Sequence, residues 1–155
     1  MPGKLILDVF IAGEAIAQPR PRACKRGTVV TMVSALSGHK VNGWKDALRF
    51  TVQFKMEGRG PVTCPVRMEA LFLMKRPKAL LKKSTVAVPT LHTKKPDLDN
   101  LLKAILDACN LIVFDDDCQV STVVMKKRYA DAIKDEMPGV RVRFLEDELQ
   151  SRRTT

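Results

Sequence analysis

Alternating apolar positions predict strands along much of the chain. Residues 5–12 (LILDVFIA) alternate and then run apolar, which is typical of a strand near a sheet edge. Residues 66–74 (VRMEALFLM) and 140–146 (VRVRFLE) alternate throughout, as half-buried strands do. β-branched side chains predict two further strands, within residues 28–33 and 118–129.

A period near 3.6 predicts two helices. Residues 42–56 (NGWKDALRFTVQFKM) place apolar side chains at helical spacing after Asn42, a favourable N-cap residue. A second helix is expected to begin between residues 97 and 100 and to end near Asn110. Its apolar stripe is formed by Leu98, Leu101, Leu102, Ile105, Leu106 and Cys109. Residues 111–114 (LIVF) form a short apolar run, which we interpret as a short strand.

Two basic segments with prolines are predicted to be connections. Residues 18–27 (QPRPRACKRG) should form a loop or an extended arm, because proline interrupts regular structure. Residues 75–95 are long for a connection, which is typical of functional or mobile loops. The pattern as a whole predicts one α+β domain over residues 1–155, with a mixed sheet of about five strands and two main helices.

Charge is distributed unevenly along the chain. The sequence has 27 Lys and Arg against 17 Asp and Glu, yet residues 97–117 contain six Asp and only Lys103. Residues 1–96 carry 18 basic and five acidic side chains. A basic protein attracts polyanions, and nucleic acid is the commonest polyanion in the cytosol. A basic solvated surface would give the same composition, so charge alone does not decide between the two.

Several classes of protein are poorly supported. No apolar run approaches the roughly 18 residues of a membrane helix, and residues 1–13 lack the basic start of a secretion signal, so we expect a cytoplasmic protein. The four cysteines are widely separated and form no C-x-x-C pair. A zinc site or a disulfide framework is therefore disfavoured, and buried free thiols are expected.

Two acidic groups flank the second predicted helix. Asp97 and Asp99 lie at its start, and Asp115, Asp116 and Asp117 follow the apolar run after its end. A chain that leaves through the helix and returns through residues 111–114 can bring four carboxylates together. Such a set repels itself unless divalent cations neutralise it, and oxygen ligands favour Mg²⁺ or Mn²⁺ over zinc.

The helix also aligns charges on its polar face. Asp99, Lys103 and Asp107 are spaced four residues apart and share this face. For Asp107 we favour an ordinary solvated face with ion pairs. An EF-hand beginning at Asp97 is excluded, because Leu102 and Ala108 stand where that loop needs Gly and Glu.

An acidic metal site within a basic surface suits phosphodiester hydrolysis. Basic side chains hold backbone phosphates, and a metal ion polarises the scissile phosphate and helps to form hydroxide from water. Lys103 is one turn from Asp99 and can add positive charge to the transition state. Pairing of Lys103 with Asp99 or Asp107 is an equally good interpretation of the spacing.

The same residues resemble a known signature. Residues 95–108 (KPDLDNLLKAILDA) followed by residues 116–120 (DDCQV) resemble the signature of the RusA-like Holliday junction resolvases, metal-dependent endonucleases of bacteria and their phages. Residues 18–22 (QPRPR) resemble the R-P-R segment of that family, and His92 stands where a histidine is common. Two positions depart from the pattern: Leu111 replaces a frequent glycine, and Asp115 replaces a frequent lysine. We expect Asp115 to be a solvated bystander.

The resemblance implies a set of roles. Asp97, Asp99 and Asp117 are implied as essential metal-binding carboxylates, Asp116 as the accompanying metal-binding acid, and Lys103 as the lysine needed for cleavage. The cofactor would be Mg²⁺, with Mn²⁺ as a substitute. The fold would be RusA-like, and the enzyme would be an intertwined homodimer that nicks symmetrically related strands of a four-way junction. The roles of Asn100, Asp107 and Gln119 stay open.

The expected phosphate contacts are basic residues of the proline-rich segment and of the approach to the helix. They are Arg20, Arg22, Lys25, Arg26, Lys94 and Lys95. Two other functional classes remain open at this point. One is a catalytically silent nucleic-acid-binding module, and the other is a nucleotide-sugar transferase that uses Asp97 and Asp99 as a D-x-D metal site.

Overall fold

The computed structural model describes residues 3–33 and 40–148. Its main sheet has four strands, in the order β1 (Leu5–Ala12), β6 (Gly139–Glu146), β4 (Val66–Met74) and β5 (Val120–Tyr129). β4 and β5 run parallel, and the other neighbours are antiparallel. All four strands form where apolar alternation or β-branched side chains predict them.

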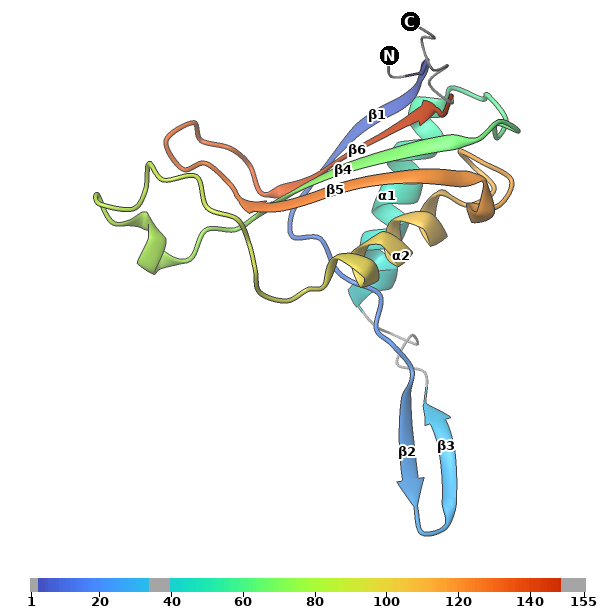
Figure 1. The fold of residues 1–155 in the computed structure, drawn as a ribbon, viewed down its shortest axis with the longest axis horizontal. Coiled ribbons are helices and arrows are strands. Elements are labelled where there is room, and N and C mark those ends of the chain that lie inside the picture. The colour runs from blue at the N-terminus through green and yellow to red at the C-terminus, as the bar shows by residue number, and fades with distance from the viewer. Residues whose placement is uncertain (1–2, 34–39, 149–155) are drawn as a thin grey trace, which may run out of the picture.

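Two helices form a second layer beside the main sheet. α1 (Lys40–Met56) and α2 (Leu98–Cys109) pack against one another and share one hydrophobic core with the sheet (Figure 1). From residue 66 to residue 72, alternate residues of β4 are buried toward this core and their neighbours are half-exposed on the other face, while the last three residues, 72–74, are all buried. The α+β class with a mixed sheet and two main helices is thus confirmed.

The core is built from side chains of the two helices and the four strands of the main sheet. Phe72, Phe144, Leu48 and Leu101 are completely buried. Phe114, which follows α2, packs edge-on against Phe144 at a centroid separation of 5.9 Å. This contact ties the turn after α2 to the sheet.

The proline-rich segment, residues 18–27, forms part of a projecting arm. β2 (Arg22–Arg26) and β3 (Val29–Val33) pair only with each other, as an antiparallel hairpin that projects away from the main body (Figure 1). Gly27 turns the hairpin with a φ of 61°, a conformation that costs glycine little. The expectation of a loop or extended arm over residues 18–27 is therefore corrected in part, because residues 22–26 form a strand. The main sheet has four strands rather than about five, because β3 pairs with β2 and not with the main sheet.

Two local expectations are wrong. α1 begins at Lys40, so Asn42 lies inside the helix and is not its N-cap. Residues 111–114 form a turn with isolated bridges and not a strand. The reason is local: Leu111 has a φ of 62°, which bends the chain immediately after α2. Leu111 thus adopts the conformation for which glycine is favoured, and its side chain is 71% exposed.

The four cysteines are free thiols, but their burial differs from the expectation. Cys109 is buried, and burial raises its pKa to about 12. Cys64 is half-buried, whereas Cys24 and Cys118 are exposed. Cys24 lies on the projecting hairpin and Cys118 on a surface turn, where no core is available to cover them.

None of the helices in the described ranges has the length and apolar character needed to cross a membrane.

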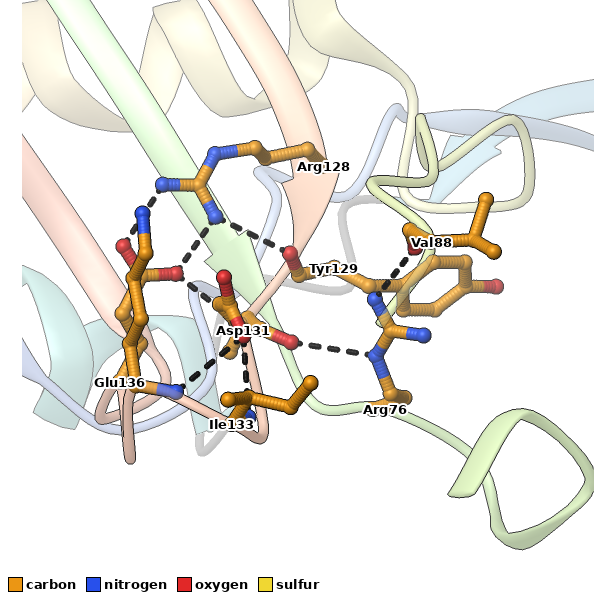
Figure 2. A network of polar contacts seen from close by, with 9 residues as sticks. Arg76, Val88, Arg128, Tyr129, Asp131, Ile133 and Glu136 are labelled. Carbon is orange, nitrogen blue, oxygen red and sulfur yellow. Dashed lines mark hydrogen bonds and ion pairs between the residues drawn. The ribbon is translucent and has the colours of Figure 1, made fainter. Parts of the chain in front are cut away.

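The long connection before α2 is held by Arg76. This buried guanidinium donates hydrogen bonds to the carbonyl oxygens of Leu80, Thr85, Val88 and Ala130, at 3.0–3.3 Å. Figure 2 shows Arg76 between the segment of Val88 and the end of β5. A short 3₁₀ helix, Lys78–Leu81, lies in the same connection. A single cation therefore gives residues 76–88 a defined path toward α2.

The turn after β5 is closed by an ion pair. Arg128 donates two hydrogen bonds to the carboxylate of Glu136, at 2.5 and 2.7 Å, and the backbone N–H of Asp131 donates a third at 2.8 Å (Figure 2). These bonds, that of Arg128 above all, lower the pKa of Glu136 from 4.5 to about 2.

We predict that Glu136→Gln lowers the free energy of unfolding at pH 7 by about 1–2 kcal/mol, a value reduced because the pair is about a quarter exposed. Because the pKa of Glu136 is depressed, its contribution is complete above pH 4.5 and disappears as pH falls through about 2. Urea denaturation at several pH values measures both effects. The exposed Glu14→Gln is the control, and equal stability of E136Q and wild type at pH 7 would contradict this account.

Candidate functional site

The start of α2 presents two carboxylates. Asp97 is the N-cap residue, and its side chain makes no capping hydrogen bond. Asp99 lies in the first turn and is exposed. Negative charge is favoured at this position, since the N-terminal end of a helix carries partial positive charge. The helix therefore displays both carboxylates at the surface without folding them into its own cap.

The proline-rich segment docks on this helix start. The backbone N–H of Gln18 donates to the carbonyl of Asn100 at 3.0 Å, and Arg20 Nε donates to Asn100 Oδ1 at 2.9 Å. The guanidinium of Arg20 also pairs with the carboxylate of Asp99. Asn100, whose role the sequence left open, thus fixes the base of the arm.

A groove runs between the docked segment and the helix. Its volume is about 890 Å³. Both signs of charge line it, from residues Ala17, Gln18, Pro19, Arg20, Lys95, Pro96, Asp97, Asp99 and Asn100. Two Asp from the acidic signature and two of the expected phosphate-binding residues, Arg20 and Lys95, therefore meet on one surface.

Lys103 connects α2 to the second acidic group. Its Nζ lies 2.8 Å from Asp107 Oδ1 and 3.5 Å from Asp117 Oδ2. The Asp107 carboxylate, with a smaller effect of Asp117, raises the pKa of Lys103 above its ordinary value. Of the two pairings considered from spacing, Asp107 is the one found, while Asp99 pairs with Arg20. Lys103 stays charged at neutral pH.

Asp107 is more than a solvated surface residue. Its second oxygen lies 3.3 Å from Nζ of Lys45 on α1, and Lys45 also donates to Gln18 Oε1 at 3.2 Å. The expectation of ion pairs is met, but the side chain is only 24% exposed. This chain of contacts joins α1, α2 and the arm, and gives Asp107 a structural role.

The acidic turn is organised by Gln119. Its Oε1 accepts hydrogen bonds from the backbone N–H groups of Asp115 and Asp116, at 2.8 and 3.0 Å. Its Nε2 donates to the carbonyls of Val62 and Cys64, at 2.9 and 3.2 Å. One amide thus fixes the carboxylate-bearing turn to the segment that precedes β4.

Asp116 begins a short 3₁₀ helix, Asp117–Gln119. Its Oδ1 accepts the backbone N–H of Cys118 at 2.9 Å, and hydrogen bonds to Cys118 lower the pKa of Asp116. Asp115 is exposed and contributes its backbone to the Gln119 contact. Asp116 therefore has one oxygen in a capping bond, while Asp117 faces Lys103.

Lys127 on β5 holds the approach to α2. Its Nζ donates to the carbonyls of Lys94 and Pro96, at 2.6 and 2.5 Å. His92 packs edge-on against Tyr129 nearby, and burial lowers the pKa of this histidine. Sequence reasoning missed Lys127 and Lys45, because a lysine that binds a distant backbone carbonyl or carboxylate leaves no local pattern.

The structure brings the two acidic groups to the same polar face through Lys103, but does not close them into one cluster. Among residues 3–33 and 40–148, no three His, Cys, Asp or Glu side chains lie close enough to hold a metal ion. Two of the acids are paired with cations instead: Asp99 with Arg20 and Asp117 with Lys103. The donor set consists only of carboxylate oxygens, which fits Mg²⁺ or Mn²⁺ chemically.

The expected phosphate contacts divide into two places. Lys94 and Lys95 are exposed just before α2, and Arg20 lies in the groove. Lys25 is exposed on the hairpin, and β2 also contains residues 22 and 26. The hairpin projects away from the main body, so it forms a second basic region apart from the groove (Figure 1).

Comparison with known proteins agrees with the motif. A family model described as "Endodeoxyribonuclease RusA" matches residues 12–144. The "Uncharacterized protein YqaN" of Bacillus subtilis (strain 168) is 31% identical over an alignment of 126 residues, which covers 78% of this chain and 86% of that protein.

We predict that Gln119→Leu lowers the free energy of unfolding by about 1–3 kcal/mol, because it leaves two N–H groups and two carbonyl groups without their partner. Urea denaturation measures the change. Asp115→Asn is the matched control, since Asp115 uses only its backbone in this contact. A Q119L variant as stable as wild type would show that the amide does not hold the turn.

Proposed function

The chain belongs to the RusA family of endodeoxyribonucleases, and we propose that it resolves four-way DNA junctions by Mg²⁺-dependent phosphodiester hydrolysis in DNA recombination and repair. The observation that carries this proposal is the groove at the start of α2, where Asp97 and Asp99 lie beside Arg20 and Lys95. Metal-dependent cleavage of DNA uses acids to bind the metal ion and cations to bind phosphate, and both lie at this groove.

Asp97, Asp99, Asp116 and Asp117 are the proposed metal ligands. When bound, Mg²⁺ or Mn²⁺ supplies Lewis-acid polarisation of the phosphate and a lowered pKa of water. Asp99 is exposed, Asp117 is partly exposed, and both are already compensated by cations, so exchange of these partners for a metal ion needs no rearrangement of the core. Asp116 retains one oxygen outside its capping bond to Cys118.

Lys103 is proposed to act as a fixed positive charge. Its raised pKa makes it unsuitable as a general base at neutral pH. Its position beside Asp117 suits it to stabilise negative charge that develops on the phosphate during cleavage. Lys45 supports Lys103 indirectly. Both lysines bind the carboxylate of Asp107, so Lys45 neutralises part of its charge and Asp107 competes less with a phosphate for the Lys103 ammonium.

Phosphate binding is proposed for both basic regions. Arg20, Lys94 and Lys95 would hold the strand at the groove, and the projecting hairpin with Arg22, Lys25 and Arg26 would contact a neighbouring arm of the junction. Two symmetrical cuts need two sites, so we propose a homodimer, including an arrangement in which the hairpins intertwine. The protein would act in the cytoplasm of a bacterium, with a phage-encoded origin compatible with the family.

A catalytically silent DNA-binding module is the second candidate. It is favoured by one observation, which is that the described carboxylates form no group of three around a common point. The nucleotide-sugar transferase interpretation is abandoned, because the chain belongs to an endodeoxyribonuclease family. Incubation of a labelled four-way junction and a matched linear duplex, with and without Mg²⁺, distinguishes the candidates. We expect metal-dependent cuts in the junction alone; no cut under any condition would favour the silent module.

We predict that Asp97→Asn, Asp99→Asn and Asp117→Asn each reduce the rate of junction cleavage by about 10³-fold or more, because each removes a charged ligand. Junction affinity should remain within a few-fold of wild type, since phosphate contacts supply it separately. Single-turnover cleavage and gel-shift binding measure the two quantities. D115N is the control and should cleave normally, and normal cleavage by any of the three other variants would remove that residue from the site.

We predict that Lys25→Gln weakens junction binding and reduces the slope of log affinity against log salt concentration by about 0.9, the effect of one lost phosphate contact. Binding titrations at several salt concentrations measure the slope. Lys134→Gln, an exposed lysine on the turn after β5, should leave the slope unchanged. An unchanged slope for K25Q would exclude this lysine from the DNA interface.

A further inference from the structure

The outer face of α1 carries an unusual apolar stripe. The helix buries Val41, Trp44, Leu48, Val52 and Met56 against the core. On the opposite side, Phe50 and Phe54 are 73% and 74% exposed, the highest values among large apolar side chains in the described ranges. Gly43 and Ala47 are exposed on the same side, and the space around Gly43 is open. Helical spacing aligns these four residues along one line.

The stripe is ordered by size. It begins with two small residues, Gly43 and Ala47, and continues with two large ones, Phe50 and Phe54. Charged residues stand at its two ends, Lys40 at the first residue of α1 and Glu57 immediately after the last. Both are exposed.

We infer that this face pairs with the same face of a second copy, with the two α1 helices antiparallel about a two-fold axis. This pairing rests on the homodimer of the proposed function and names its contact. An antiparallel alignment centred between Ala47 and Phe50 sets each Phe50 against Ala47 of the other copy. It also sets each Phe54 against Gly43 of the other copy. Large side chains then fill the space left by small ones on both sides of the axis.

The charges at the ends of the stripe are complementary in the same register. In this register, Lys40 of one copy faces Glu57 of the other at each end of the helix pair. A parallel alignment would instead place Lys40 against Lys40, Glu57 against Glu57 and Gly43 against Gly43, which combines repulsion with unfilled space. Size and charge therefore select the same orientation and the same register.

The area is that of an interface core. A phenylalanine buries about 150–250 Å², so four of them, two from each copy, bury roughly 600–1,000 Å². A standard interface buries about 1,600 Å² in total. The α1 pair thus supplies the central contact of a dimer, and neighbouring surfaces contribute the remainder.

DNA is a less suitable occupant of this face. Proteins that stack bases on aromatic side chains surround them with positive charge. Here the charges are mixed: Asp46 pairs with Arg49, and Lys40 and Glu57 stand at opposite ends of the stripe. A surface with both signs of charge suits a second copy, in which Lys40 meets Glu57, better than a backbone that carries only negative charge.

Sedimentation equilibrium of the full chain tests the pairing. Wild type is expected to dimerise at micromolar concentration, and Phe50→Ala and Ala47→Phe should each raise the dimer dissociation constant about tenfold or more. The double variant A47F/F50A should return to within a few-fold of wild type, because large again faces small. These positions are exposed in the single chain, so the variants should keep wild-type thermal stability at dilute concentration.

A charge swap at the ends of the stripe provides an independent test of the pairing. Lys40→Glu and Glu57→Lys should each weaken the dimer, and K40E/E57K should restore it, which a parallel pairing would not allow. Ile133→Ala is the control, since Ile133 is 62% exposed on a turn away from α1. The pairing is overturned by a monomeric wild type, by a dimer indifferent to these variants, or by F50A lowering junction affinity without changing the association state.

Junction cleavage separates this inference from the proposed activity. A monomer that cuts four-way junctions overturns the α1 pairing and leaves the nuclease assignment intact. A dimer that responds to the swaps as described but cuts no junction supports the pairing and removes the nuclease assignment.

Discussion

Compensation of clustered negative charge is the constraint on which this structure depends. Asp99 pairs with Arg20 from the proline-rich segment, Asp117 with Lys103 from α2, and Asp107 with both Lys103 and Lys45. These cations come from three separate segments, so balancing the charge also docks the arm, both helices and the acidic turn. In the proposed metal site, Asp99 and Asp117 would exchange these protein cations for a metal ion.

Much of the fold could be predicted from the chain because its elements bury one face. The alternation of β4 and the helical period of α1 each report a side that faces the core. The errors fall where no core imposes a period. β2 pairs only with its hairpin neighbour. The turn after α2 is set by the positive φ of Leu111, a conformation that a leucine in the sequence does not predict.

The candidate site divides in the same way. Asp97, Asp99 and Lys103 follow from helical spacing and from resemblance to a signature, because they lie close together in sequence. The contacts of Gln119 and Lys127 could not be foreseen, since their partners are backbone carbonyls 31 to 57 positions away. The groove likewise needs the docking of Gln18 on Asn100, a contact between distant segments that only the folded chain reveals.

The central claim, made as a proposal, is that the acidic groups on either side of α2 bind divalent metal in one shared site. Titration with Mn²⁺, followed by paramagnetic broadening of backbone amide signals, tests it directly. We expect the amides of residues 97–100 and 115–119 to broaden in parallel at the same Mn²⁺ concentrations, and Asp99→Asn to weaken both effects. Broadening of one group alone, or of the two groups at clearly different concentrations, would contradict a shared site.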